Sequence, residues 1–204
     1  PYSRALYSLK LAIMLLGPTG YPFEVFVSRV LEENGYRVQT RQQLTGRCVT
    51  HEIDVIAEKD GEKAMIETKF HNNPGTRSDV RVALYVKARF DDVKDKHGFT
   101  KGWVVTNTKT TLDANAYADC SDMRIMSWNY PEGSSLRELV EKSNLHPITM
   151  LTSLNASQKL KILKKHIILC KDLNADRKIL KILGLSQEQE KEVIDELRYI
   201  CGSD

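Results

Sequence analysis

Residues 52–69 read EIDVIAEKDGEKAMIETK, two segments rich in apolar residues joined by Asp60-Gly61. Aspartate followed by glycine between two such segments is a strong signal for the two-residue type I′ turn of a β-hairpin. In that turn Lys59 faces Glu62, and the pairing of every residue farther along the two strands follows from this pair. The stretch therefore predicts an antiparallel hairpin together with its register.

The predicted register places four polar side chains on one face of the hairpin. Asp54 lies directly opposite Glu67, and Glu52 lies directly opposite Lys69. Because side chains alternate along a strand, residues two positions apart project from the same face. The other face then carries residues suited to a core, namely Ile53, Val55, Ala57, Ala64, Ile66 and Thr68.

Opposed carboxylates at Asp54 and Glu67 point to a cation. Two directly facing carboxylates, about 5 Å apart at Cβ, repel each other unless a positive charge lies between them. Mg²⁺ prefers oxygen ligands and usually takes one or two carboxylates together with water and substrate phosphate. With Lys69 beside it, such a centre can hydrolyse a phosphodiester, because the cation activates water and the lysine supports the nucleophile or the developing charge. The alternative is a solvated hairpin face whose acids pair with lysines.

Hydrophobic periodicity predicts further helices and strands on both sides of the hairpin. Helices are expected at residues 6–16, 22–35, 78–92, 112–118 and 135–142. Strands are expected at residues 36–42, 48–57, 63–70, 103–106 and 124–128. A hairpin followed by strands that alternate with helices favours an α/β fold with a mixed central sheet flanked by helices on both faces.

The pattern of the chain changes near residue 146. From Ile148 onward the strand signal nearly disappears, and short amphipathic helices follow one another. We therefore predict a main domain at residues 20–145 and a small all-α domain at residues 146–204. Residues 1–19 are expected to form a helix or linker from an upstream domain, since the chain starts abruptly at Pro1 without a signal-peptide pattern.

Composition narrows the class of protein. Hydrophobic residues make up 41% and charged residues 28% of the 204 residues, which is ordinary for a soluble globular protein. The net charge of +3 is too small to identify a partner. The four cysteines lie far apart without a CxxC pair, which argues against a zinc knuckle or a disulfide scaffold and favours reduced thiols in the cytoplasm. We expect no membrane span, since no apolar run approaches ~20 residues.

The sequence resembles the PD-(D/E)xK nuclease superfamily, and within it the Mrr-like restriction endonucleases and archaeal Holliday-junction resolvases. The matching text is Phe23-Glu24 on a helix, residues 52–56 on one strand and residues 66–70 on the next. The order of a helical glutamate, an aspartate and a Glu-x-Lys triplet is that of the superfamily. The resemblance spans roughly residues 20–130 and implies a restriction-endonuclease-like fold. The sequence departs from many Mrr-like proteins at residues 49–52, where they carry glycine-rich text.

The resemblance implies roles for particular residues. Asp54 and Glu67 would bind Mg²⁺, or Mn²⁺ as a substitute, with the backbone carbonyl of Thr68 as a third ligand. Lys69 would be the catalytic lysine, and Glu24 an accessory acid near the metal. From the residues alone, Glu24 is as readily explained as a first-turn acid that favours the helix dipole. Domains of this type also follow ATP-cone nucleotide-binding modules, which would fit an upstream domain.

Other residues are candidate accessory groups. Glu52 is placed to orient Lys69, and His71 lies beyond Lys69 on the same face, where it could contact phosphate or simply be exposed. Arg81, Tyr85 and Arg89 recur every four residues and could follow a DNA backbone from one helix face. A charged, solvated helix face would explain these three residues equally well.

The C-terminal region has an uneven charge distribution. Residues 155–183 contain eight Lys or Arg but two acidic residues, whereas the chain from Gly184 onward is acidic. A basic half on a small helical domain suits nucleic-acid docking. The text at residues 182–185 faintly resembles the hairpin of helix-hairpin-helix modules. A dimerisation surface or a plain solvated face are the alternatives.

These observations together predict a Mg²⁺-dependent endodeoxyribonuclease of the Mrr-like restriction or DNA-repair type. Its partner would be DNA, and it would act as a homodimer. The alternative function is a catalytically silent or partner-dependent DNA-binding or assembly module on a nuclease fold. A Holliday-junction resolvase is a third interpretation, which requires a dimer with two centres and a preference for four-way junctions.

Overall fold

A computed structural model describes residues 9–201 of the chain. The chain divides into two compact units. One comprises Phe23–Ser143, and the other combines Pro1–Pro22 with Asn144–Asp204. The division after Ser143 lies close to the boundary predicted near residue 146, while residues 9–22 group with the C-terminal region.

Three antiparallel strands form one half of the central sheet. They are β1 (Arg37–Thr45), β2 (Thr50–Lys59) and β3 (Glu62–Lys69). The turn between β2 and β3 has positive φ at Asp60 (50°) and Gly61 (82°), as a type I′ turn requires. The pairs from Lys59↔Glu62 to Val55↔Ile66 confirm the register predicted from the Asp-Gly signal.

The β2–β3 ladder departs from the prediction at Asp54. Its pairs end at Val55↔Ile66, so the predicted facing pairs at residues 54 and 67 and at residues 52 and 69 are not part of it. On the other side of β2, the pairing with β1 skips Arg41 and Asp54, and Arg41 has a left-handed φ of 51°. Ile53 packs in the same cluster as Ile56, although strict alternation would put the two on opposite faces. The strand is therefore irregular at Asp54, and the expectation that Ile53 shares a face with Val55 was wrong.

Parallel strands complete the sheet. The strand order is β1-β2-β3-β5-β7, with β5 (Lys101–Thr106) parallel to β3 and β7 (Met123–Met126) parallel to β5. The connections run through α3 (Val80–His97) and α4 (Leu112–Asp119). This architecture confirms the predicted mixed sheet. The two-residue strands β4 (Arg77–Ser78) and β6 (Lys109–Thr110) form a second small sheet, which was not predicted.

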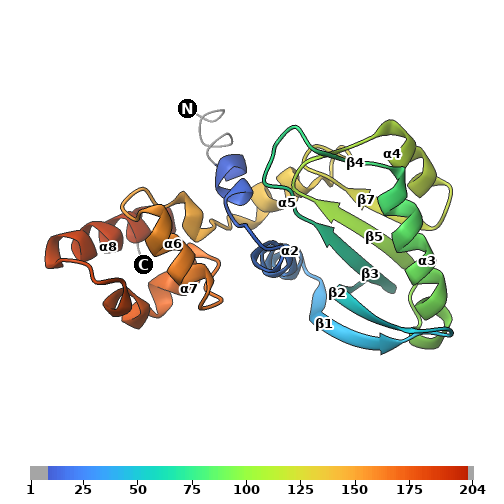
Figure 1. Ribbon diagram of the computed structural model, residues 1–204, viewed down its shortest axis with the longest axis horizontal. Coiled ribbons are helices and arrows are strands. Elements are labelled where there is room, and N and C mark those ends of the chain that lie inside the picture. The colour runs from blue at the N-terminus through green and yellow to red at the C-terminus, as the bar shows by residue number, and fades with distance from the viewer. Residues whose placement is uncertain (1–8, 202–204) are drawn as a thin grey trace. The chain divides into compact units, whose positions relative to one another are not determined.

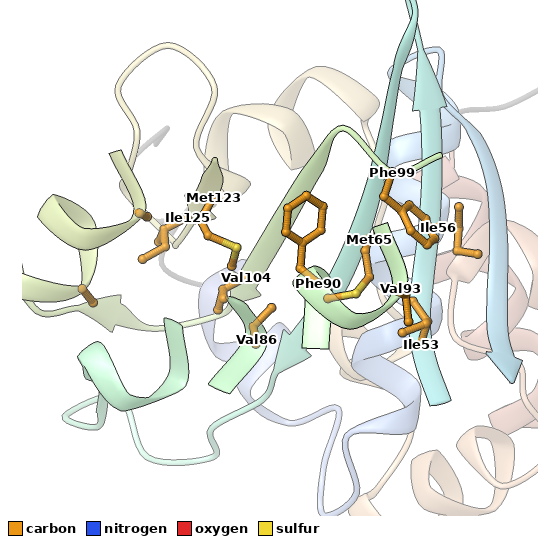
Figure 2. Packing of buried hydrophobic residues seen from close by; sticks show 12 residues of the cluster. Ile53, Ile56, Met65, Val86, Phe90, Val93, Phe99, Val104, Met123 and Ile125 are labelled. Atoms are coloured by element: carbon orange, nitrogen blue, oxygen red, sulfur yellow. The ribbon is translucent and has the colours of Figure 1, made fainter. Parts of the chain in front are cut away.

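Helices α3 and α4 cover one face of the sheet (Figure 1). Figure 2 shows Val86, Phe90 and Val93 of α3 lying against the side chains of the sheet. The buried cluster on this face comprises Ile53, Ile56, Met65, Val86, Phe90, Val93, Phe99, Val104, Ala114, Ala118, Met123 and Ile125. These residues fix α3 against β2 and β3, which places the polar residues of α3 beside the ends of those strands.

The other face of the sheet is covered by α2 (Tyr21–Glu33) and α5 (Leu136–Ser143), which lie on the side away from α3 (Figure 1). The apolar stripe of α2 is fully buried, at Phe23, Phe26, Val27, Val30 and Leu31. At the end of α2, the amide of Asn34 donates to Leu139 O and Ser143 Oγ and so joins the two helices. The helix predicted from about residue 22 is confirmed, with Pro22 in its first turn.

The unit that contains the C-terminal region is built from short helices. They are η1 (Ile148–Met150), α6 (Ala156–Leu163), α7 (Cys170–Ala175), η2 (Arg177–Leu183) and α8 (Gln187–Cys201). Residues 9–14 are also helical, and Thr149 Oγ1 donates to Ala12 O at 2.6 Å within this unit. The start predicted for the first helix, at residue 6, lies outside the described residues. None of the helices described between residues 9 and 201 has the length and apolar character that a membrane span requires.

The loop between β1 and β2 is held by Asp92 of α3. The carboxylate of Asp92 accepts hydrogen bonds from Cys48 N at 2.7 Å, Val49 N at 3.2 Å and His51 Nε2 at 2.8 Å. These bonds, that of His51 foremost, hold the pKa of Asp92 well below its usual range. Since the folded-state pKa is lowered, the clamp stabilises the fold above the ordinary aspartate pKa of ~3.9 and is lost as acid protonates Asp92.

We expect Gly46→Ala to destabilise the protein through this clamp. A Cβ at Gly46 would lie 2.1 Å from Asp92 Oδ2 and 2.9 Å from Val49 O, and neither atom is free to move away. Forcing such overlap typically costs about 1–3 kcal/mol, which lowers the melting temperature by roughly 2–12 °C for a chain of this size. Thermal unfolding measures the loss. Gly75→Ala is the matched control, because a Cβ there meets only Asn73 Oδ1 at 3.3 Å; an equal effect of the two changes would refute the clamp.

Candidate metal centre and nucleic-acid site

Asp54 takes the place of a missing strand partner. Its Oδ2 accepts hydrogen bonds from Thr68 N at 2.8 Å and Thr68 Oγ1 at 3.1 Å. Because β2 leaves the ladder after Val55, the Thr68 N–H needs another acceptor, and the Asp54 carboxylate supplies it. Because Thr68 stands between Glu67 and Lys69 in β3, these bonds hold the Asp54 carboxylate beside both residues. Among the described residues, Asp54 Oδ1 accepts no hydrogen bond, which leaves it available to a cation or solvent.

Glu67 is neutralised by two cations in this structure. Lys69 Nζ lies 2.6 Å from Glu67 Oε1, and Arg89 Nη1 is paired with Glu67 Oε2. Glu67 is 8% and Arg89 9% exposed, so this second pair is buried. Arg89 also donates through Nη2 to the backbone carbonyl of Glu52. Arg89 thus links α3 both to the candidate metal ligand and to the irregular part of β2.

Glu24 adds a third carboxylate to the same region. Burial raises the pKa of Glu24 from 4.5 to about 7, with a further contribution from the negative charge of Asp54 and smaller ones from Glu52 and Glu67. Burial and the charge of Glu67 likewise raise the pKa of Asp54 above its ordinary value. Carboxylates that raise one another's pKa in this way are stabilised by any added positive charge.

The oxygen atoms of Asp54 and Glu67 fit a hard divalent cation. Within residues 9–201, no three His, Cys, Asp or Glu side chains are arranged so that they could hold a metal by themselves. Mg²⁺ does not require such a set, because one or two carboxylates are usually completed by water and substrate phosphate. The buried carboxylate of Glu67 and the partly buried carboxylate of Asp54, whose pKa is raised, match that incomplete kind of site.

Glu52 does not contact Lys69, contrary to prediction. Its carboxylate is paired with Arg41 Nη2 at 3.3 Å and accepts from Gln43 Nε2 at 3.3 Å, both on β1. The reason is the break at Asp54, which removes Glu52 from the position opposite Lys69. The backbone carbonyl of Glu52, rather than its side chain, contributes to the site through Arg89.

His71 lies just after β3 and is held by Asn107. Asn107 Oδ1 accepts from His71 N at 2.8 Å, and Asn107 Nδ2 donates to His71 O at 2.7 Å. The imidazole Nε2 lies 3.1 Å from Ser78 Oγ, and burial, followed by the charge of Lys69, lowers the pKa of His71. Asn107 was missed at the sequence level, although a polar residue directly after a predicted strand that ends at Thr106 is a recognisable signal for the carboxyl edge of a parallel sheet.

The helix face predicted to follow DNA divides into two parts. The Arg81 side chain is exposed and paired with Asp79, and Tyr85 is 57% exposed. The Tyr85 ring centroid lies 5.9 Å from Lys69 Nζ and 5.4 Å from Arg89 Cζ. Arg89 does not belong to the exposed face, because its pairing with Glu67 keeps it buried. The prediction that Arg89 lies along a DNA backbone is therefore not supported.

Two family models match different parts of the chain. The model described as restriction endonuclease, the Mrr catalytic domain, matches residues 16–132 and so covers more than half of the sequence. The model described as AF1548-like, C-terminal, matches residues 146–201. The first match includes Glu24, Asp54, Glu67 and Lys69.

Relatives and solved structures extend this finding. A protein of Archaeoglobus fulgidus described as uncharacterized is 40% identical over 177 residues, which are 86% of this chain and 100% of the relative. The crystal structure of AF1548, described as a protein of unknown function, is 40% identical with a TM-score of 0.75 and covers 91% of this chain and 100% of its own. A repair endonuclease from Pyrococcus abyssi is 20% identical with a TM-score of 0.40 and covers 52% of this chain and 44% of its own.

Proposed function

Because the chain belongs to the restriction endonuclease family, we propose that it is a metal-dependent endonuclease that hydrolyses phosphodiester bonds in DNA. The observation that carries the proposal is the grouping of Asp54, at the irregular point of β2, with Glu67 and Lys69 at the C-terminal end of β3. Two carboxylates and an amine at one point provide what phosphodiester hydrolysis needs, namely cation ligands and a group that stabilises negative charge.

The proposed mechanism assigns a distinct task to each residue. Asp54 and Glu67 would hold Mg²⁺, or Mn²⁺ in its place, with the carbonyl of Thr68 as a third ligand. When bound, the cation supplies Lewis acidity at the phosphate. Lys69 Nζ, which lies 2.6 Å from Glu67 Oε1, donates a hydrogen bond to the attacking water or to a phosphate oxygen. The charge that develops on the phosphate is thereby stabilised by a group that is already in place.

Glu24 is proposed as an accessory acid. Its pKa of about 7 means that it carries a proton for part of the time near neutral pH. A carboxyl group in that range can exchange a proton with a water near the cation. His71 is assigned a supporting part at the end of β3, since Asn107 and Ser78 already hold its backbone and ring.

We further propose that the exposed part of α3 contacts the DNA backbone. Arg81 offers a guanidinium at the N-terminal end of α3, and Tyr85 offers a hydroxyl and a ring next to Lys69. A homodimer would bring two centres to the two strands of a duplex, which is required for a double-strand break in one binding event.

Metal removal provides the direct test. We expect the purified protein to nick DNA with Mg²⁺ or Mn²⁺, and we expect cleavage to fall to background when EDTA is added in excess. Replenishing either cation should restore it, because within residues 9–201 the candidate site offers fewer than three ligand side chains, too few to retain a metal against a chelator. Gel assays on supercoiled plasmid, linear duplex and four-way junctions measure the result. If the protein cleaves none of these with either cation, the proposal fails.

One observation favours a second candidate function, a DNA-binding module that is silent without a partner. Both carboxylate oxygens of Glu67 are engaged, one by Lys69 and the other by Arg89. Arg89 must move away from Glu67 Oε2 before that oxygen can bind a metal ion. This candidate would be favoured if the protein binds DNA in metal-free buffer and produces no cleavage in the gel assay above.

A further inference from the structure

Basic side chains gather on two adjoining helices of the C-terminal region. Between residues 155 and 183 the chain has eight Lys or Arg and two acidic residues. Helices α6 and η2 pack against each other in this unit. Five of the eight basic side chains are exposed, namely Lys161, Lys164, Lys165, Lys178 and Lys181. Within residues 9–201, none of these five takes part in an ion pair, so their charges are not already balanced.

Lys161 lies in the last turn of α6, and Lys164 and Lys165 follow directly in the turn that ends it. Lys164 is the C-cap of α6 with helical backbone angles, and its spacing of three residues from Lys161 puts these two lysines on a common face, with Lys165 next to them in the turn. Ile162 and Leu163 are buried and anchor the opposite side. The helix is fixed at its start by a capping box between Asn155 and Gln158, so the stripe is displayed on an ordered element.

The second stripe lies on η2. Lys178 and Lys181 are three residues apart, and side chains at that spacing align along a 3₁₀ helix. Leu180 and Leu183 have the same spacing and are buried, which directs the lysines away from the core. Asp176 caps η2, since its Oδ1 accepts from Lys178 N at 3.1 Å, and its single negative charge is outnumbered by the five exposed lysines.

Two other basic residues of the segment are used internally. Lys159 Nζ donates to Thr149 O at 3.1 Å, and burial lowers the pKa of Lys159. Arg177 Nη2 donates to Asn174 Oδ1 at 2.6 Å. Lys159 and Arg177 therefore use their side chains to hold the fold together. The five exposed lysines do not, so their charges remain available to a ligand.

We propose that the exposed lysines of α6 and η2 form a phosphate-binding surface for duplex DNA. The surface has five compact ammonium groups on or directly after the ordered helices α6 and η2, and such point charges fit the evenly charged phosphate backbone. The inference rests on the proposed function, since it supplies the nuclease with a second contact to its substrate. It accounts for the contrast with α8, whose exposed face carries Glu188, Glu192 and Asp195.

The test is DNA binding in metal-free buffer, where no cleavage occurs. Fluorescence anisotropy with a labelled random-sequence duplex is recorded between about 50 and 200 mM salt. Lys178→Ala/Lys181→Ala should weaken binding roughly tenfold or more. It should also make the negative slope of log K against log salt shallower by about 1.8, at about 0.9 for each phosphate contact. Lys161→Ala/Lys164→Ala/Lys165→Ala should lower the slope by about 2.7.

The matched control removes the same number of charges from α8. Lys191→Ala/Arg198→Ala deletes two exposed basic residues of this unit outside the proposed surface, and it should leave both affinity and slope near the wild-type values. Circular dichroism melting shows whether each variant is folded. Equal losses from the control and from the η2 variant would overturn the surface, as would wild-type binding by both lysine variants. Tighter binding of a duplex RNA through the same lysines would also overturn the assignment to DNA.

Failure of this inference is separable from failure of the proposed function. The binding assay contains no metal and compares variants of the α6 and η2 lysines with the wild type, whereas the metal-dependent cleavage assay reports on Asp54, Glu67 and Lys69. A protein that cleaves DNA but binds it independently of these lysines retains the nuclease centre and loses the second surface.

Discussion

Replacement of Lys69 by alanine is expected to slow DNA cleavage by about 10²–10³-fold, the usual effect of losing one group that stabilises charge in the transition state. Lys69 Nζ lies 2.6 Å from Glu67 Oε1 and is the amine next to the two candidate metal ligands. Arg89 cannot replace it, because its guanidinium is already committed to Glu67 and to the Glu52 carbonyl. Single-turnover cleavage with saturating enzyme measures the loss of the chemical step.

Lys96→Ala is the control for this substitution. Lys96 is exposed near the end of α3, about two turns beyond Arg89, so its removal changes the net charge by the same amount without touching the site. Duplex binding in metal-free buffer should be nearly unchanged in both variants. A Lys69→Ala protein that cleaves at the wild-type rate would remove Lys69 from the mechanism, and one that loses DNA binding to the same degree would make it a binding residue instead.

The overall fold follows from local signals in the sequence. The Asp60-Gly61 turn specifies the hairpin because both residues tolerate positive φ, and apolar periodicity specifies the helices that cover the sheet. Each of these signals depends on residues that are close together in the sequence, so it can be read without knowing how the rest of the chain packs. The strands β4 and β6 were missed because two residues are too few to show a period.

The geometry of the site depends on contacts that no local pattern records. The register was confirmed up to Val55, but the break at Asp54 arises where Arg41, thirteen positions earlier, adopts a left-handed conformation. Nothing in the text around Asp54 marks that break. Because of the break, Asp54 is hydrogen-bonded to Thr68 and does not face Glu67 directly. Asp54, Glu67 and Lys69 nevertheless remain grouped together.

Arg89 shows why a helical repeat was misleading. Arg81, Tyr85 and Arg89 share a spacing that is typical of one exposed face, but the helix crosses the sheet so that its successive turns meet different surroundings. Arg81 reaches solvent, whereas Arg89 meets the buried carboxylate of Glu67. Whether a charged residue on an amphipathic helix is solvated or paired is decided by what the sheet presents to it, and this is known only once the two are packed.

The pairing of Arg89 with Glu67 leads to the second large expected effect. Arg89→Ala should reduce the free energy of unfolding by about 3 kcal/mol, because removing one partner leaves a buried charge without compensation. The value is taken at the lower end of the usual range since Lys69 still contacts Glu67 Oε1. For a chain of this size, the loss corresponds to a fall of roughly 6–12 °C in melting temperature. Thermal and urea unfolding without metal measure it.

A double-mutant cycle distinguishes the ion pair from lost packing. Glu67→Gln removes the charge that Arg89 neutralises, so Arg89→Ala should cost much less in that background than in the wild type. Mg²⁺ provides an independent readout, because a cation at Asp54 and Glu67 can replace the missing guanidinium. Its addition should therefore raise the melting temperature of Arg89→Ala more than that of the wild type. An equal cost in both backgrounds, with no differential response to Mg²⁺, would show that Arg89 acts by packing alone and would leave Glu67 without a role for its buried charge.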